Sequence, residues 1–541
     1  MKPIRVISGF LTVGFWTLVS RVLGMVREIL LFSLIGAGPL LDAFFAAFRL
    51  PNMFRRFFAE GAFNSAFVPL ISKKYEKNEN ASAFANEALG GLAFILLILT
   101  TLAIIFMPAL IWAIANGFVG DERFDLTVAF GRIMFPYILL ISLAALLSGV
   151  LNALGYFAAA AAAPVLLNIT IILGLCISFF FEWPTMTILI YSVPFAGILQ
   201  LALLWRAAEK AGFKIKPSRP RLSDDMRILV RVAIPSALAN GVLQINLLVG
   251  QFVSSQETGA ISWLYGADRL YQLPLGVVGI AIGIVLLPEL SRRIASKDEK
   301  GARSAFNNAF TTSMALTIPA TLALFIIPLP LISALFQHGQ TSTNDAIAMA
   351  LATSIYALGL PAFVLQKIYQ PLYFARGDTK TPFKFAVLSM IVNSIIAIGL
   401  MPFYGWIAAP IATTISAWAM IILLVLGIKN IGAIGQLTKL SKSKFLLIIL
   451  SSFIMGLFLW GANFLLKNDV SSILERIIFA IFLILLGVVT YFIPPGLKKN
   501  DRTKPITNPA KSAIHSSPVP NKKLKSNCTL INVTINAKAC D

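Results

Sequence analysis

The chain has 541 residues, of which 57% are hydrophobic and only 13% are charged, and its mean hydropathy is +0.82. A water-soluble domain is typically about half apolar and about a quarter charged, so this composition excludes a soluble globular protein. The formal net charge of +21 would suit a nucleic-acid-binding protein. The lysines and arginines, however, collect in short loops between apolar runs, which indicates membrane orientation rather than a nucleic-acid partner.

Apolar runs of roughly 20 residues recur from end to end, and each is long enough to cross about 30 Å of hydrocarbon. Because lipid cannot satisfy backbone N–H and C=O groups, such runs are expected to be helices. The sequence therefore predicts an all-α polytopic membrane protein with about fourteen transmembrane helices. They are expected near residues 8–34, 41–72, 86–115, 126–152, 160–181, 185–207, 228–254, 259–290, 307–335, 345–374, 383–402, 405–428, 444–466 and 473–494.

The loops between these spans alternate in charge. Lys73, Lys74 and Lys77 follow span two, and comparable basic loops follow spans six, eight, ten and twelve. Loops 36–40, 255–258 and 336–344 contain no lysine or arginine, and loop 116–125 contains Arg123 alone. Because basic loops stay in the cytoplasm, strict alternation predicts an even number of spans with both termini cytoplasmic.

Two parts of the chain resemble each other weakly. Phe48-Arg49-Leu50 in span two has a counterpart in Asp268-Arg269-Leu270 of span eight, about 220 residues later. Shared helix-end chemistry is the alternative to a duplication. A parallel repeat predicts a cavity between two halves that rock against each other. The expected parts are an N-lobe (1–208), a basic cytoplasmic linker (209–227), a C-lobe (228–430), two added spans (431–495) and a disordered cytoplasmic tail (496–541).

Ionisable residues within the spans concentrate in the first two. An intramembrane charge is expensive, so it usually faces a watery cavity or pairs with another charge. The residues in question are Arg21, Arg27, Glu28, Asp42, Arg49, Arg55, Arg56 and Glu60, with Arg132, Asp268, Arg269 and Lys367 further along. Salt bridges that fix helix register, such as Arg56 with Glu60, are one interpretation. For Arg21, Arg27, Arg55 and Arg269 we favour a cargo-binding role, because the local carboxylates are fewer than the arginines.

An uncompensated arginine in a cavity favours an anionic cargo. The guanidinium fork binds phosphate or carboxylate oxygens in pairs and stays charged when partly desolvated. The sequence contains no Walker loop, only two histidines, and no nucleophile placed beside a base, so we expect no enzymatic activity. None of the three cysteines is spaced as a metal ligand, and neither a metal nor a cofactor is expected.

Several motifs resemble those of the MviN/MurJ family of lipid II flippases. They are SRVLGMVRE at 20–28, DAFF at 42–45, LPNMFRRFFAEGAF at 50–63, FPY at 135–137, YGADRL at 265–270 and FARGDTKTP at 374–382. The span-two string is long and unusual in composition, and the resemblance covers roughly residues 5–495.

The resemblance implies the fold of the multidrug/oligosaccharidyl-lipid/polysaccharide exporter superfamily, with two six-helix lobes around a cationic cavity and two added helices beside a groove for a lipid tail. It implies lipid II as the cargo, flipped by alternating access in the bacterial inner membrane, with membrane lipids and other cell-wall synthesis proteins as partners. Arg21, Arg27, Arg55 and Arg269 would bind the headgroup. The cavity and gate residues would be Asp42, Glu60, Arg56, Asp268 and Glu28.

The chain departs from the family pattern in two places. Six alanines occupy residues 158–163, where relatives often have a proline-containing turn, so we expect a more helical turn here. Asn246 and Gly250 stand where some members place a carboxylate thought to bind sodium, which argues against sodium coupling and leaves membrane potential acting on the arginines as an open alternative. We also expect loop 36–42 to pack against the turn between spans seven and eight when the cavity opens inward.

Three other functions remain open from the sequence. A multidrug or metabolite antiporter of the same superfamily would need a more apolar cavity and an intramembrane carboxylate for ion exchange. A flippase for another polyprenyl-diphosphate sugar would share the shape and differ in the motifs of spans one and two. A membrane scaffold for wall synthesis would leave the arginines unexplained.

Overall fold

The computed structural model describes residues 6–55, 62–77, 79–428, 432–466 and 472–493. These residues are helical almost throughout, and no β-strand occurs among them. The described residues all fall within one compact unit. The predicted all-α class is confirmed for the part of the chain that is described.

The first six predicted spans correspond to nine helices and one 3₁₀ turn. Three of these spans are each divided between two consecutive helices. The elements are α1 (Val6–Ile35), α2 (Pro39–Arg55), α3 (Ala62–Glu76), α4 (Ala81–Ile105), α5 (Met107–Ile114), η2 (Asn116–Phe118), α6 (Glu122–Met134), α7 (Tyr137–Ala153), α8 (Ala158–Phe180) and α9 (Thr185–Lys210).

The remaining eight predicted spans are likewise found as helices or runs of helices. They are α10 (Asp224–Ser254), α11 (Ala260–Pro274), η3 (Leu275–Ile280), α12 (Ala281–Ala295), α13 (Glu299–Ile326), α14 (Pro328–Phe336), α15 (Thr343–Phe374), α16 (Lys380–Tyr404), η4 (Gly405–Ile407), α17 (Ala408–Ile428), η5 (Ala433–Gly435), α18 (Lys439–Leu466) and α19 (Ile473–Tyr491). Among the described residues, nine helical stretches are long and apolar enough to cross a membrane.

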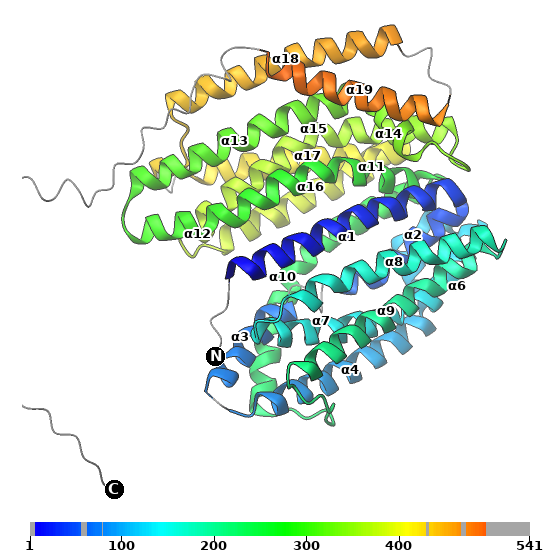
Figure 1. The fold of residues 1–541 in the computed structure, drawn as a ribbon, viewed down its shortest axis with the longest axis vertical. Coiled ribbons are helices and arrows are strands. Elements are labelled where there is room, and N and C mark those ends of the chain that lie inside the picture. Colours follow the sequence, from blue (N-terminus) through cyan, green and yellow to red (C-terminus); the bar gives the residue numbers. More distant parts are fainter. Residues whose placement is uncertain (1–5, 56–61, 78, 429–431, 467–471, 494–541) are drawn as a thin grey trace, which may run out of the picture. The chain divides into compact units, whose positions relative to one another are not determined.

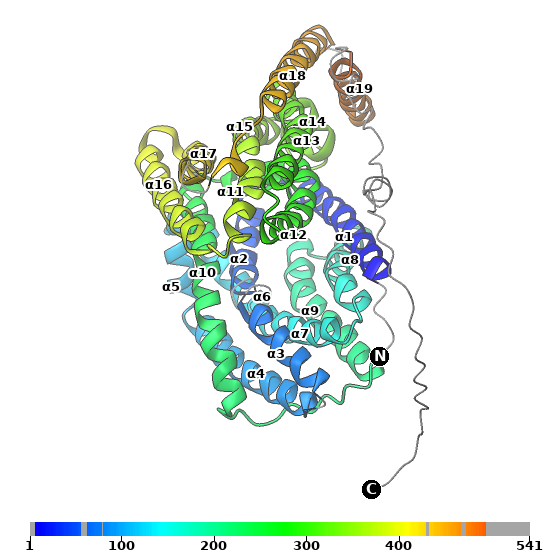
Figure 2. The same ribbon diagram turned by 90° about the vertical axis from the view of Figure 1, so that its left-hand side faces the viewer.

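Within residues 1–494 the helices pack in two groups joined by a few contacts (Figures 1 and 2). In the first group α1 packs on α8, α8 on α9, α7 on α9, and α2 on α6. In the second, α15 is central and contacts α11, α13, α14 and α17, while α18 packs on α13 and α19 on α18. The groups meet where α10 contacts α3, α11 contacts α2, and α1 contacts α14.

The predicted span 259–290 is interrupted in its middle. It divides into α11, the π-helical turn η3 and α12. Pro274 lacks a backbone N–H, and Gly276 and Gly279 are poor helix formers, so a regular α-helix is weakest at this point. A π turn inside an α-helix often marks a functional site.

The alanine run behaves as its composition predicts. α8 begins at Ala158, directly after a turn in which Gly155 has a φ of 82°. Alanine is the best helix former, and Pro164 is tolerated within the first two turns of α8 at the cost of one hydrogen bond. The six alanines therefore form the first turns of α8.

The basic linker between α9 and α10 lies along α4. The side chain of Asn86 accepts a hydrogen bond from the Lys216 amide at 2.8 Å and donates one to the Lys214 carbonyl at 3.0 Å. The Ser218 amide donates to the Asn86 carbonyl at 3.1 Å. A Cβ on Gly90 would overlap the Ser218 carbonyl, so a glycine is needed for this close approach.

We expect Gly90→Ala to detach the linker from α4, because overpacking of this kind typically costs about 1–3 kcal/mol. Limited trypsin digestion of the purified chain should then cleave between residues 210 and 221 at least about tenfold faster. Gly91→Ala is the matched control, since a Cβ there would meet only Met226 Cε, at an ordinary 3.6 Å. Equal cleavage of the two variants would show that the linker is not held through Gly90.

Candidate functional site

Three charged residues from both helical groups meet in the interior. Arg27 and Glu28 of α1 are 7% and 0% exposed, and Arg27 Nη2 donates a hydrogen bond to Glu28 Oε1. Arg269 of α11 forms an ion pair with the same oxygen, its Nε lying 3.4 Å away. One carboxylate is therefore shared by two guanidinium groups from helices that are far apart in the sequence. We call these three residues the arginine cluster.

Each arginine of the cluster is oriented by a polar neighbour. Arg27 Nη1 donates to Asn168 Oδ1 of α8 at 3.0 Å, and Asn168 Nδ2 donates to the Ser20 carbonyl at 2.9 Å. Arg269 donates to the Tyr265 hydroxyl, and its Cζ lies 4.5 Å from the centre of the Tyr265 ring. These contacts orient the two guanidinium groups in addition to their bonds with Glu28.

Arg21 takes a different position from its helical neighbours. It is exposed, and its guanidinium lies so close to Gly276 of the π turn η3 that a Cβ there would overlap Arg21 Nη1. Lys367 of α15, also exposed, lies beside the other glycine of the turn, with its Cγ 3.6 Å from where a Gly279 Cβ would be. The small residues of η3 therefore leave room for cations from α1 and α15.

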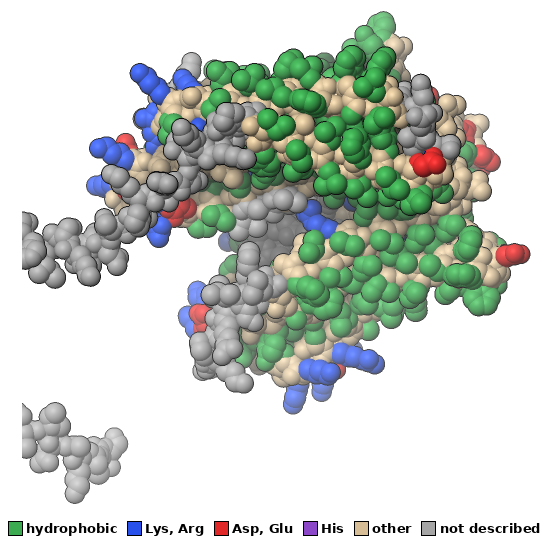
Figure 3. Space-filling view, turned by 45° about the horizontal axis from the view of Figure 1, so that its top comes forward, with side chains coloured by type: hydrophobic (Ala, Val, Ile, Leu, Met, Phe, Trp, Pro, Cys, Tyr) green, Lys and Arg blue, Asp and Glu red, His purple; other side chains and the backbone are tan. Residues whose placement is uncertain are grey.

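Glu28 is shared by the two arginines of the cluster, and Arg269 also interacts electrostatically with Asp268. The side chain of Arg269 is still 33% exposed. Figure 3 shows a hollow between the two helical groups, with Lys or Arg side chains on its wall, while hydrophobic side chains cover the broad outer surface. Arg27 and Arg269 are thus partly neutralised by Glu28.

A second polar network joins the two helical groups at one end. This is the end where the loops contain few lysines or arginines. Asp42 of α2 is 0% exposed. It accepts hydrogen bonds from the amides of Gly259 (2.6 Å) and Ser262 (2.9 Å) and from the Ser262 hydroxyl (2.6 Å). Gly259 is the N-cap of α11 and has no side chain of its own, so Asp42 caps this helix from the other helical group. This is the packing expected between loop 36–42 and the turn after span seven.

Arg123 completes the second network and was missed as a site residue. Its Nη1 lies 3.8 Å from Asp42 Oδ2 and 3.2 Å from the Glu257 carbonyl, to which it donates, and its Nε pairs with Asp121 at 2.6 Å. The side chain is buried over the Phe118 ring. The sequence did contain a clue to its role, because Arg123 is the one cation of loop 116–125. We call Asp42, Arg123, Gly259 and Ser262 the Asp42 latch.

A further contact joins the two groups at the same end. The Gln340 amide donates to the Ser33 carbonyl at 2.9 Å, and the Thr341 hydroxyl donates to the Phe32 carbonyl at 2.7 Å. The last turn of α1 is thereby bonded to the loop between α14 and α15. A Cβ on Gly36 would lie 2.6 Å from the Gln340 carbonyl, so the chain approach depends on glycine.

Some expected site residues fall outside these networks. Arg55 ends α2, and its side chain is not described; Arg56 and Glu60 lie outside the described residues. Asp268, by contrast, interacts electrostatically with Arg269 of the arginine cluster, and it accepts a hydrogen bond from Gln272 Nε2, one turn along α11. Within the described ranges, no group of three or more His, Cys, Asp or Glu side chains is arranged to hold a metal ion.

Chemically, the arrangement offers donors for an anion. Arg27 and Arg269 bring guanidinium groups from the two helical groups together, and the Asp42 latch joins those groups at one end. Guanidinium forks bind phosphate oxygens in pairs, so a phosphate-bearing group matches the donors.

The sequence matches the family described as lipid II flippase MurJ over residues 31–479. A protein of Rhizobium tropici named probable lipid II flippase MurJ is 40% identical over 496 residues, covering 88% of this chain and 93% of the relative. A protein of the same name from Rhizobium meliloti is 43% identical over 425 residues, covering 77% and 79%.

Solved structures agree with this fold. The chain is similar to a lipid II flippase MurJ in an inward closed conformation, with a TM-score of 0.76 and 28% identity, covering 89% of this chain and 97% of that one. An inward-facing multidrug resistance MATE family transporter of the MOP superfamily has a TM-score of 0.59 at 14% identity, covering 79% and 94%. The second likeness concerns the fold alone.

We expect Asp42→Ala to loosen the latch, because three donors and Arg123 lose a buried acceptor at about 1–3 kcal/mol for each group left unsatisfied. Hydrogen exchange of peptides covering residues 256–263 should become at least about tenfold faster. Asp125→Ala removes an exposed carboxylate from α6 and serves as the control. Unchanged exchange in Asp42→Ala would mean that the latch does not hold α11.

Proposed function

The chain belongs to the lipid II flippase MurJ family, and from this we propose that it moves lipid II from the inner to the outer leaflet of the bacterial cytoplasmic membrane for cell-wall synthesis. Lipid II is an undecaprenyl diphosphate that carries a disaccharide and a pentapeptide. Its charged headgroup cannot cross hydrocarbon unaided, since desolvating a diphosphate costs many kcal/mol. A polar hollow between two helical groups can replace the lost hydration while the polyprenyl tail stays in lipid.

The arginine cluster is the observation that best supports this cargo. Arg27 and Arg269 come from opposite helical groups and share one carboxylate, Glu28. Arg21 is exposed beside the π turn η3. We propose that these three arginines, with Arg55, bind the diphosphate and the sugar-peptide headgroup. In the same proposal Arg56, Glu60 and Asp268 belong to the cavity wall.

Alternating access follows from the position of the contacts. The Asp42 latch and the bonds from Ser33 and Phe32 to the α14–α15 loop join the helical groups at the end with few cations. By the positive-inside rule that end faces outward, and both termini lie in the cytoplasm. We propose that this structure is inward-facing, and that parting of the latch opens the hollow to the outside.

The division of labour along the chain follows the same proposal. Residues 1–208 and 228–430 would be the two lobes that rock, with 209–227 as the linker between them. The two added spans within 431–495 would border the groove for the polyprenyl tail, and 496–541 would be a cytoplasmic tail. Separately expressed lobes that still assemble and flip lipid II would support these boundaries.

The central test is depletion of the protein in a bacterium that depends on it. Depletion should lower the amount of lipid II accessible at the outer surface, measured with a reagent that acts on exposed lipid II. Undiminished outer-leaflet lipid II would contradict the proposed function. A different polyprenyl-diphosphate sugar that accumulated inside instead would identify the other flippase activity left open by the fold.

Arg21→Glu and Arg27→Glu should each abolish rescue of the depleted strain, because an anion replaces a cation that the diphosphate needs. The loss should exceed about a hundredfold in outer-leaflet lipid II formed per unit of protein, as for the loss of a charged contact worth about 3 kcal/mol. Arg219→Glu, in the linker outside the spans, is the control for charge reversal. All three variants are compared at equal membrane abundance, and full rescue by the two α1 variants would remove the headgroup role.

A further inference from the structure

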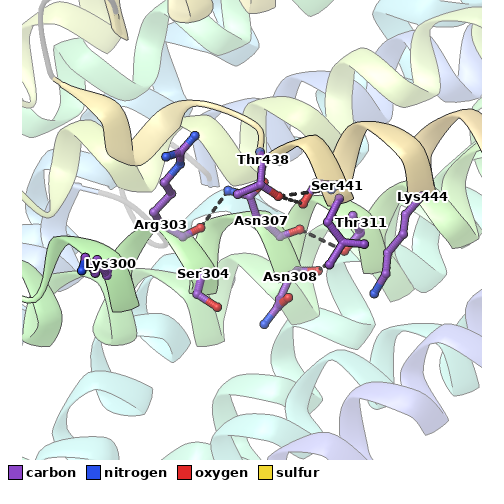
Figure 4. A pocket seen from close by; sticks show the side chains of 10 residues that line it. Lys300, Arg303, Ser304, Asn307, Asn308, Thr311, Thr438, Ser441 and Lys444 are labelled. Carbon is purple, nitrogen blue, oxygen red and sulfur yellow. Dashed lines mark hydrogen bonds between the residues drawn. The ribbon is translucent and has the colours of Figure 1, made fainter. Parts of the chain in front are cut away.

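A basic pocket lies between the N-terminal turns of α13 and α18. It shares no residue with the arginine cluster or with the Asp42 latch. Figure 4 shows the side chains that line it. Three are cations, Lys300, Arg303 and Lys444, and most of the others are serine, threonine and asparagine. No carboxylate is part of the lining, within the portion of the chain that the structure describes. A pocket of this composition favours an anion.

The back wall of the pocket is fixed by hydrogen bonds. Asn307 is 4% exposed; its Nδ2 donates to the carbonyls of Arg303 (2.8 Å) and Gln436 (3.2 Å), and its Oδ1 accepts from the Thr438 amide at 2.9 Å. The hydroxyls of Thr438 and Ser441 lie 2.9 Å apart. The first turn of α18 is therefore held against α13, and the pocket exists before any ligand arrives.

The cations at the front of the pocket are not neutralised. Among the described residues no carboxylate forms an ion pair with Lys300, Arg303 or Lys444. Asp298, close in sequence, accepts from the Gly301 amide at 2.8 Å and pairs with Arg293 at 2.8 Å, and these contacts hold its pKa below the usual value. Asp298 therefore pairs with Arg293 and the Gly301 amide, and not with the cations of the pocket.

The pocket lies where a polar surface changes to an apolar one. One step deeper, the rings of Phe310 and Phe445 pack at 5.4 Å. On the face of α18 that carries Lys444, Leu440 and Leu447 are 60% and 37% exposed. A membrane lipid matches this sequence of features, because its phosphate lies at the interface and its acyl chains run beside the helix.

We propose that this pocket binds the phosphate of a membrane lipid headgroup, with Lys300, Arg303 and Lys444 as the cationic donors and exposed apolar side chains of α18 against the lipid chain. Ser304 and Asn308, both exposed and part of the lining, supply further donors. The phosphate can belong to an anionic phospholipid or to a polyprenyl diphosphate. The site does not depend on the proposed transport, since binding is measured without translocation.

The test uses the purified full chain and native mass spectrometry with three probes: phosphatidylglycerol, undecaprenyl diphosphate and inorganic phosphate. Lys300→Ala/Lys444→Ala should weaken binding of the lipid probe roughly tenfold or more, because each lysine near an anionic headgroup contributes a several-fold factor. Lys439→Ala/Lys442→Ala removes two lysines of α18 outside the lining and should change binding less than about twofold. Ser304→Leu, which narrows the pocket without changing charge, should weaken the same probe.

Each binding result either supports the lipid-phosphate site or overturns it. Selective loss with phosphatidylglycerol identifies a phospholipid site, and selective loss with undecaprenyl diphosphate identifies a carrier-lipid site; both support the proposal. Equal loss in the two double-lysine variants would reduce the effect to diffuse surface charge and overturn it. So would displacement of the lipid by inorganic phosphate at the same concentration, or an unaltered affinity in Lys300→Ala/Lys444→Ala.

Discussion

The sharing of Glu28 by Arg27 and Arg269 is the interaction on which the interior depends. Leaving a charge unpaired in a membrane protein is costly, and a buried ion pair is strongly destabilised when one partner is removed. One carboxylate offers two oxygens, and the structure uses Oε1 for both arginines, while Oε2 has no hydrogen-bond partner among the described residues. The helices that carry the cluster are therefore joined through a single carboxylate oxygen, and an anionic cargo would compete with it for the two arginines.

At the other polar network, the Asp42 latch, buried polar groups must likewise find partners. The N-terminus of α11 needs acceptors for its first amides, and Gly259 cannot supply one. Asp42 supplies it from the other helical group, so the cap exists only while the groups are together. When they part, water can take over the α11 amides, and Arg123 still has Asp121 as a partner. Asp42 thus caps α11 while the two helical groups are together, and water can replace it when they part.

Hydropathy and loop charge predicted the helices well, because span length and the distribution of lysine and arginine are local properties of the sequence. Pairings were harder, since they depend on how distant helices meet. Ser262 and Asp42 are 220 residues apart, and Asn168 and Arg27 are 141 apart. Glu28 lies on the face of Arg21 by helical spacing, yet its partners are the adjacent Arg27 and the remote Arg269. Span 259–290 was predicted without interruption, and the π turn η3 in its middle was not foreseen.

Cargo binding and motion are coupled if the proposed function holds. A ligand shifts a conformational equilibrium only by its difference in affinity for the two states. A diphosphate that enters the hollow competes with Glu28 for Arg27 and Arg269, so it weakens the bond between the helical groups while supplying a new bridge between them. Because Arg269 lies in α11, the helix whose N-terminus Asp42 caps, a shift of Arg269 toward the cargo acts along α11 on the latch. The same helix then carries both the headgroup contact and the seal, and this is why one rigid element can link binding to opening.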